Sequence, residues 1–381
     1  MKDYRNQNFF IHTFSYENTF SYTSAKKIWH TYNMHIIKND ENELYVMKFS
    51  EQGLRIYFRY RTKKEIKYDK EHAAITVEWI VTPYKILHPG NPMGKIISSE
   101  QFTLVLNRLH KMFMSIEKEI GVTFISKLKI KRIDLTCDVM TPSIIYSREI
   151  ISVCKATRLR SGYSFWTMTK EQKEKKGWDD RAACLYKNKS RGILGKIYDK
   201  KDNLNELGYF SILAALQNKG LLRFEITLER QALKKNEILY HGCSNQSLFQ
   251  VMKEAKTLFQ KYFLDVFDQG DMLSETLLCR YIKQKFSRQK KAQNDMLELC
   301  KIYNYCRKHC KEFRLEDFPH SEKTLKRIQK KYRNFSLSPI PLSDQCPYIP
   351  SFSKMLEGTY SDMLMNYARI HTRGKEYWDN E

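Results

Sequence analysis

Apolar and polar positions alternate along the first part of the chain, which predicts β-strands there. In segment 54–61, Leu, Ile, Phe and Tyr alternate with mostly basic residues, and segment 75–81 repeats the pattern. A period of two is typical of half-buried antiparallel strands. The prolines and glycines of 83–94 predict a rigid loop. A helix is expected from Ser98 onward, because apolar residues then recur every three or four positions.

A second strand-rich region follows, and the pattern then becomes helical. Strands are expected at 129–139, 182–187, 194–200 and 221–229, with a helix at 147–156 and a polar loop at 170–180. This order predicts an α+β fold: an antiparallel sheet with helices on one face, an arrangement that allows two similar lobes, followed by a mostly helical C-terminal part. Helical segments are expected at 248–267, 275–308 and 321–332, and the proline-bearing tail at 339–350 predicts a loop that wraps the surface.

The pattern suggests three segments. Residues 1–125 form a strand-rich N-terminal lobe that binds DNA, 126–235 a catalytic lobe, and 236–381 a helical, basic, DNA-binding region. Apolar runs stay well below the ~18 residues needed to span a bilayer, and the start lacks a signal-peptide core, so a cytoplasmic protein without a membrane partner is expected. Nine cysteines without a disulfide spacing favour reduced thiols.

Net charge points to a polyanionic partner. Lysine and arginine number 66 against 43 acidic residues, a net charge of +23. Glycine-rich phosphate loops are absent, so an ATPase has no support. Basic side chains that share one face of a predicted strand or helix are candidates for contacts to DNA phosphates, although a solvated basic surface is the alternative. They are Arg55, Arg59 and Arg61 on a strand, and Lys326, Arg327 and Lys330 on the last helix.

Carboxylates recur on two predicted strands. In 132–139 one face carries Arg132, Asp134, Thr136 and Asp138, and in 222–229 one face carries Arg223, Glu225, Thr227 and Glu229. If these strands are neighbours, their carboxylates meet on one side of the sheet. Oxygen ligands without softer donors suit Mg²⁺ or Mn²⁺. The alternative is a solvated strand face with ordinary salt bridges.

Two tyrosines lie in basic surroundings. Lys196, Tyr198 and Lys200 are expected on one strand face, and Tyr186 is followed by Lys187 and Lys189. A tyrosine with a pKa near ~10 is a poor nucleophile, and flanking ammonium groups lower the cost of its phenolate. A surface tyrosine between lysines is the alternative in a chain with 24 tyrosines. Cys300, Cys306, His309 and Cys310 lack paired zinc-ligand spacing, which favours core thiols.

Four blocks, in order over about residues 75–235, resemble the filamentous-phage gene II replication proteins, a family related to rolling-circle plasmid initiators. They are the P-x-K-x-L-x-x-x-N-x-x-G segment that begins at Pro83, Arg132-Ile133-Asp134, Tyr198-Asp199-Lys200 and Leu222-Arg223-Phe224-Glu225. Plasmid initiators carry their nucleophile earlier, in a Tyr-x-Gly-Ser segment. Tyr186 stands there, but the glycine is missing, which favours Tyr198.

The resemblance implies a single-strand DNA endonuclease and strand transferase. Such a protein binds its replication origin, duplex and single-stranded, and becomes joined to a 5′ phosphate through tyrosine. The free 3′ hydroxyl primes a host polymerase, with a host helicase as a further partner, in the cytoplasm of a bacterial host. Tyr198 would be the nucleophile, with Asp134 and Glu225 as metal ligands and Glu78 or Asp138 as the third. Phosphates would be held by Lys200, Lys196, Lys85 and Arg223.

Two other classes of function fit the same residues. A non-catalytic DNA- or RNA-binding regulator would use the basic surface alone, and would lack a common pocket for Asp134, Glu225 and Tyr198. A tyrosine transposase or mobilisation relaxase would cleave in the same way, but would transfer strands between different DNA molecules.

Overall fold

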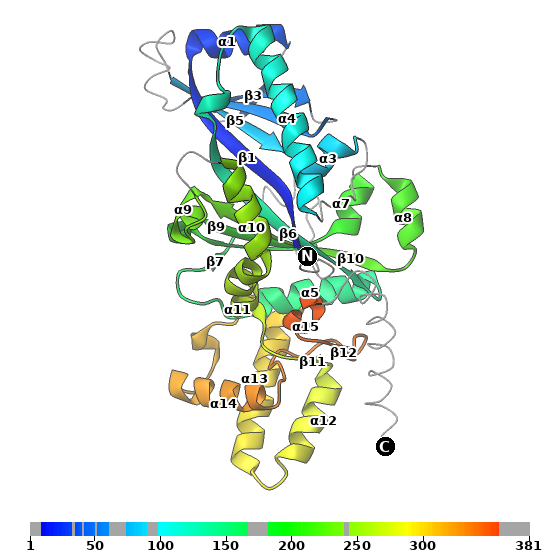
Figure 1. The fold of residues 1–381 in the computed structure, drawn as a ribbon. Coiled ribbons are helices and arrows are strands. Elements are labelled where there is room, and N and C mark those ends of the chain that lie inside the picture. The colour runs from blue at the N-terminus through cyan, green and yellow to red at the C-terminus, as the bar shows by residue number, and fades with distance from the viewer. Residues whose placement is uncertain are drawn as a thin grey trace. The chain divides into compact units, whose positions relative to one another are not determined.

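The computed structural model describes residues 9–32, 35–39, 42–49, 52–60, 74–89, 98–166, 182–206, 208–239 and 244–357. They divide into two compact units (Figure 1). Of the described residues, the N-terminal unit contains those of Phe9–Thr136 and Thr227–Lys256, and the C-terminal unit contains those of 137–226 and 257–357. Two boundaries fall inside the strands β6 (Lys129–Thr141) and β10 (Gly220–Glu229), and a third falls inside helix α10 (Ser244–Phe259). These boundaries differ from the expected ones at 125 and 235.

Antiparallel strands form the frame of the N-terminal unit, in the order β2-β3-β4-β5-β1-β6. Period-two alternation predicted β4 and β5 correctly. The long first strand, β1, has the same alternation but was not predicted. The strands of this unit that precede β6 are β1 (Phe9–Ser21), β2 (His35–Asn39), β3 (Asn42–Phe49), β4 (Leu54–Tyr60) and β5 (Ala74–Val81).

Helix α4 (Ser99–Ile120) packs along the strands of this unit, with the Ser98 hydroxyl capping its first turn as the sequence predicted (Figure 1). Its buried face carries Phe102, Leu109 and Phe113, and the Phe113 ring meets the ring of Trp79 edge-on. The segment expected to begin as a loop at Pro83 instead starts with a short helix, α3 (Pro83–Leu87), because proline is well tolerated in a first helical turn. The other helices are α1 (Tyr22–Thr31), α9 (Arg230–Lys235) and α10 (Ser244–Phe259).

In the C-terminal unit the strand order is β6-β10-β9-β8-β7, and β8 pairs antiparallel with both β7 and β9. Helix α5 (Ile144–Ala156) packs on β8 and β9, and also on helix α13 (Lys290–Lys308). The remaining strands and short helices here are β7 (Ser164–Phe165), β8 (Ala183–Asn188), β9 (Ile193–Asp199), α7 (Lys200–Glu206) and α8 (Phe210–Leu216). The predicted polar loop 170–180 lies outside the described residues.

The helical C-terminal part was also predicted, and with the sheet it confirms the α+β class. The expected segment 275–308 is two helices, α12 (Glu275–Lys285) and α13 (Lys290–Lys308), which pack on each other. Helix α14 (Glu322–Asn334) begins after an N-cap at Ser321, as expected. A π-helical turn (Gln260–Leu264) and α11 (Asp265–Phe267) precede them.

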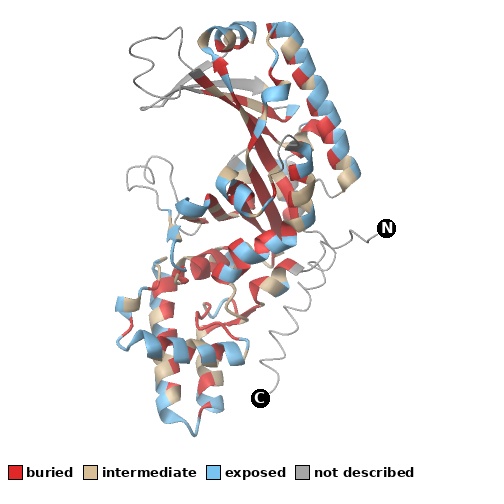
Figure 2. Ribbon diagram, turned by 60° about the vertical axis from the view of Figure 1, so that its left-hand side comes forward, coloured by how far each residue is buried: buried red, intermediate tan, exposed pale blue. Residues whose placement is uncertain are grey.

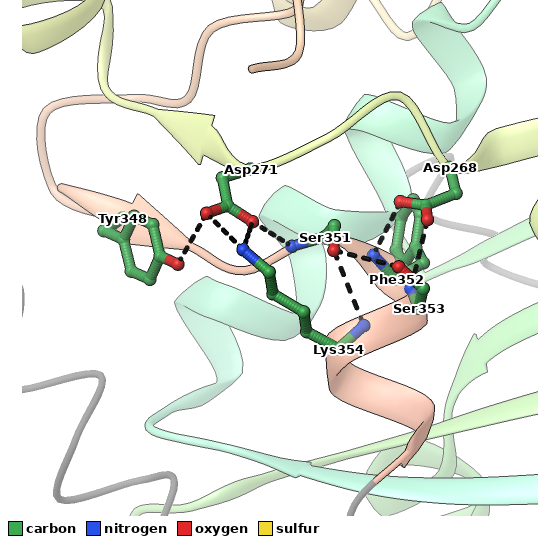
Figure 3. A network of polar contacts seen from close by, with 7 residues as sticks. All are labelled: Asp268, Asp271, Tyr348, Ser351, Phe352, Ser353 and Lys354. Atoms are coloured by element: carbon green, nitrogen blue, oxygen red, sulfur yellow. Dashed lines mark hydrogen bonds and ion pairs between the residues drawn. The ribbon is translucent and has the colours of Figure 1, made fainter. Parts of the chain in front are cut away.

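The proline-bearing tail does not wrap the surface as predicted. Leu342, Cys346 and Tyr348 are buried, and β12 (Tyr348–Ile349) pairs with β11 (Met272–Leu273). Figure 3 shows two aspartates that hold this tail: Asp268 accepts from the first amides of α15 (Phe352–Glu357), and Asp271 accepts from the Tyr348 hydroxyl, the Ser351 amide and the Lys354 ammonium. The tail is therefore part of the core.

Candidate functional site

The candidate site lies on one face of the sheet in the C-terminal unit. Along β9, the residues Ile193, Gly195, Ile197 and Asp199 are buried, whereas Leu194, Lys196 and Tyr198 are partly exposed. Period-two alternation therefore gives β9 one covered and one accessible face. Figure 2 shows that buried residues predominate along the strands. Neighbouring strands β10 and β6 bring Arg223, Glu225 and Asp138 to the same cluster.

Arg223 and Asp138 form a buried, two-point ion pair. The Arg223 Nε donates to Asp138 Oδ1 at 2.6 Å and Nη2 donates to Oδ2 at 2.8 Å, while the two residues are 1% and 2% exposed. Burial alone would lower the pKa of Arg223, but the Asp138 carboxylate outweighs it and holds that pKa above its usual range. Two parallel bonds fix the plane of the guanidinium, so Arg223 is a preorganised cation.

The guanidinium of Arg223 also donates a hydrogen bond to the Tyr198 hydroxyl. Burial raises the pKa of Tyr198 above its ordinary value, and the nearby Glu225 and Asp138 carboxylates raise it further, against a smaller opposing effect of Arg223. The expectation that flanking lysines ease formation of the phenolate is wrong for this arrangement. The resting tyrosine is a neutral phenol beside a fixed cation.

The two lysines that flank Tyr198 have separate roles. Lys196 Nζ donates to Glu225 Oε1 at 2.7 Å, and its side chain is 32% exposed against 6% for Glu225. Lys200 does not share the strand face as predicted: β9 ends at Asp199, and Lys200 is a buried residue of α7 whose ammonium donates to Asn203 Oδ1 at 2.5 Å. Only Lys196 therefore lies beside Glu225 at the partly exposed edge of the cluster.

Tyr186, the second candidate nucleophile, is a core residue. It is 0% exposed, its hydroxyl donates to the Tyr262 carbonyl at 3.0 Å, and burial raises its pKa well above the ordinary value. Its ring lies over Gly195, its partner on β9, where a Cβ atom would come within 1.9 Å of the ring. Of the two candidate tyrosines, Tyr198 is the one that reaches the surface.

Two more predicted ligands, Glu78 and Asp134, belong to the N-terminal unit. The Ser15 hydroxyl donates to Glu78 at 2.9 Å, and the Lys131 ammonium pairs with the other Glu78 oxygen. Burial raises the pKa of Glu78, but Lys131 and Arg132 outweigh it, so the net shift is downward. Asp134 accepts from the Thr13 hydroxyl through Oδ2, while its buried Oδ1 has no hydrogen-bond partner among the described residues.

These residues do not fit the predicted Mg²⁺ or Mn²⁺ site within either unit. Each unit contributes two of the four carboxylates, and Asp138, Glu225 and Glu78 are each neutralised by a basic side chain of the protein. The described residues contain no group of three Asp, Glu, His or Cys side chains arranged to hold a metal ion. Of the three cysteines expected to be core thiols, Cys300 and Cys306 are buried, whereas Cys310 is partly exposed.

The predicted DNA-binding residues are spread over both units. Arg55 on β4 and Lys85 on α3 are partly exposed, and the side chains of Arg59 and Arg61 lie outside the described part of the chain. Helix α14 exposes Lys326, Arg327 and Lys330 opposite its buried face. Lys326 pairs with Glu322 at 3.5 Å, and Arg327 pairs with Asp295 at 3.1 Å.

Sequence reasoning missed the β1 residues and Lys131. Thr13 and Ser15 hydrogen-bond to Asp134 and Glu78, and the signal for their strand was present as Phe10, Phe14, Tyr16 and Phe20 at even spacing. Nothing in the sequence around Lys131 indicates its role. Its partner, Glu78, lies on another strand, and only the register of the strands brings the two side chains together.

Comparison of the chain with models of known protein families and with characterised proteins finds no match. Among the helices in the described ranges, none has the length and apolar character required to cross a bilayer.

Proposed function

We propose that this protein is a rolling-circle replication initiator, which nicks and rejoins one strand of origin DNA through a covalent 5′-phosphotyrosine at Tyr198. The observation that carries the proposal is the environment of the Tyr198 hydroxyl: it is partly accessible, hydrogen-bonded by a guanidinium that Asp138 fixes, and adjacent to Glu225. A tyrosine used only for packing needs neither a preorganised cation nor a carboxylate beside its oxygen.

These residues can support an in-line phosphoryl transfer. The phenol oxygen of Tyr198 attacks phosphorus, its proton passes to Glu225, and the bond from phosphorus to the 3′ oxygen breaks. Arg223 stabilises the negative charge on the non-bridging oxygens, the largest requirement of this reaction class. Lys196 donates a proton to the departing 3′ oxygen, and the 2.7 Å contact between Lys196 and Glu225 lets the proton on Glu225 return to Lys196. Rejoining is the reverse sequence.

A covalent-adduct assay tests the proposal. The protein is incubated with labelled circular single-stranded DNA that contains its own coding sequence and the flanking DNA, with Mg²⁺ or Mn²⁺, and resolved on a denaturing gel. A labelled protein band is expected for the wild type and not for Tyr198→Phe. Tyr305→Phe, which changes an exposed tyrosine of α13, is the matched control and should form the adduct normally.

The rival functions give different results in the same assay. A non-catalytic DNA-binding regulator retains DNA binding and gives no adduct with the wild-type protein. A transposase or mobilisation relaxase gives the adduct, but joins the cut end to a second DNA molecule, whereas an initiator closes the cut strand into a circle. Circular product with no intermolecular joining is the expected result.

A further inference from the structure

Helices α13 and α14 enclose a basic pocket in the C-terminal unit. The pocket has a volume of about 370 Å³ and lies between the first turn of α13 and the middle of α14. Four of its side chains are cationic and one is acidic: Lys290, Lys291, Arg327 and Lys331, with Asp295. The excess of positive charge makes an anionic ligand the natural occupant.

Two of the pocket's cations are held in place by neighbouring side chains. Arg327 Nη2 lies 3.1 Å from Asp295 Oδ2, and the Asp295 side chain is only 13% exposed. Lys331 Nζ lies over the ring of the buried Phe286, 5.3 Å from its centroid. Both contacts fix part of a long side chain before any ligand arrives, which lowers the entropy lost on binding.

The other two cations remain available. Lys290 and Lys291 are exposed, and neither makes an ion pair with any residue in the described part of the chain. They begin α13, directly after the turn that follows α12. Their charges are therefore free to be neutralised by a ligand rather than by the protein.

The packing of α14 joins the pocket to a longer basic surface. The Tyr332 hydroxyl donates to the Met296 carbonyl at 2.8 Å, and Leu325 and Ile328 are buried on the same side, which fixes the rotation of α14. The opposite side then exposes Lys323, Lys326 and Lys330 at helical spacing. A row of cations that continues out of a pocket suits a ligand with repeated negative charges better than a single small anion.

We propose that the α13–α14 pocket binds a backbone phosphate of DNA, with Lys290, Lys291, Arg327 and Lys331 as its ligands, and that the outer row of α14 follows the next phosphates along the strand. The proposal rests on the proposed replication function only in naming DNA as the polyanion. It adds Lys290 and Lys291 to the DNA-binding surface, and gives α14 a defined side from which the strand enters.

Salt-dependent binding tests this site. The variant Lys290→Gln with Lys291→Gln is compared with wild type by fluorescence anisotropy, using a short labelled duplex of arbitrary sequence and its single strand as separate arms. Each lost phosphate contact lowers the slope of log affinity against log salt by about 0.9 for duplex DNA and about 0.7 for single strands. The slope for the double variant should therefore be lower by about 1.8 with duplex DNA or by about 1.4 with single-stranded DNA. The DNA form whose affinity falls more is the one that the pocket binds.

The matched control is Lys301→Gln with Lys308→Gln. It removes two exposed lysines from the same helix, away from the pocket. An unchanged slope in this control is expected. Equal losses in both double variants would mean a general effect of net charge and would overturn the pocket, as would a pocket variant that binds like wild type. All proteins are checked for matching thermal unfolding.

The outcome is separable from that of the proposed function. The pocket variant should still form the covalent adduct with single-stranded DNA at saturating concentration, because its lysines lie outside the Tyr198 cluster. If the wild-type protein forms no adduct, but the salt slope of the pocket variant falls by the expected amount, the phosphate-binding pocket is supported and the nicking function is refuted. If the adduct forms and the slope does not change, the pocket alone is refuted.

Discussion

Asp199 offers the most quantitative test of the structure, because its carboxyl group is buried without full compensation. It is 2% exposed, and Oδ2 has no hydrogen-bond partner among the described residues, while Oδ1 accepts from the Lys201 amide at 2.8 Å. Burial raises its pKa from 3.8 to about 6, with a further contribution from Asp202. Because the folded-state pKa is raised, folding favours the protonated form, and the carboxylate costs stability as pH rises.

The size of the effect follows from linkage between protonation and folding. Well below pH 3.8 the Asp199 carboxyl group is protonated in both the folded and the unfolded protein, so it costs no stability. Well above pH 6 it is ionised in both, and the full cost is present. A difference of about 2.2 pKa units corresponds to about 3 kcal/mol at pH 7, falling to about 1.6 kcal/mol at pH 5. Asp199→Asn keeps the oxygen that accepts from Lys201 and removes the charge. It should therefore stabilise the protein by up to those amounts.

Urea unfolding at several pH values between 5 and 8 measures this difference. The gain of Asp199→Asn over wild type should grow from pH 5 to pH 7 and then level off. Asp265→Asn, which removes an exposed carboxylate from the same unit, should give no comparable trend. A gain that does not vary with pH, or an asparagine variant that is less stable than wild type at pH 7, would contradict a raised pKa of Asp199 in the folded protein.

Three further predictions concern the same site and its surroundings. Asp138→Asn leaves the buried Arg223 guanidinium without its carboxylate and should cost about 3–5 kcal/mol in urea unfolding, whereas a loss below about 1 kcal/mol would contradict the buried pair. Gly195→Ala places a methyl group against the Tyr186 ring and should cost about 1–3 kcal/mol in the wild-type background but less in a Tyr186→Ala background; an equal cost in both backgrounds would show that the ring is not the obstacle. Glu225→Ala removes the proton acceptor of the proposed transfer and should abolish cleavage while leaving duplex binding nearly intact, and full cleavage by this variant would contradict that role.

Local pattern was enough to predict most of the elements of the fold. Alternation identified β4, β5, β6, β9 and β10, and the apolar spacing after Ser98 identified α4. The prediction of a surface tail was wrong, because proline content indicates irregular backbone but not burial. Asp268 and Asp271 supply the partners that let the tail enter the core.

The site could be predicted only in part. Alternation placed Tyr198 and Lys196 on one face of β9, but the end of that strand at Asp199 moved Lys200 to α7. The burial of Tyr186 depends on Tyr262 and Gly195, and its contact with the π-helical turn joins segments far apart in the chain. The pairing of each carboxylate with its own cation also depends on strand register, which the sequence of one strand does not specify.

The proposed function requires Tyr198 to become covalently joined to DNA. Digestion of the gel-purified adduct with trypsin and nuclease, followed by mass spectrometry, identifies the modified residue directly. A nucleotide is expected on the peptide Ile197-Tyr198-Asp199-Lys200. A nucleotide on the peptide that contains Leu185-Tyr186-Lys187 would contradict it, since the buried Tyr186 would then have to leave the core to react.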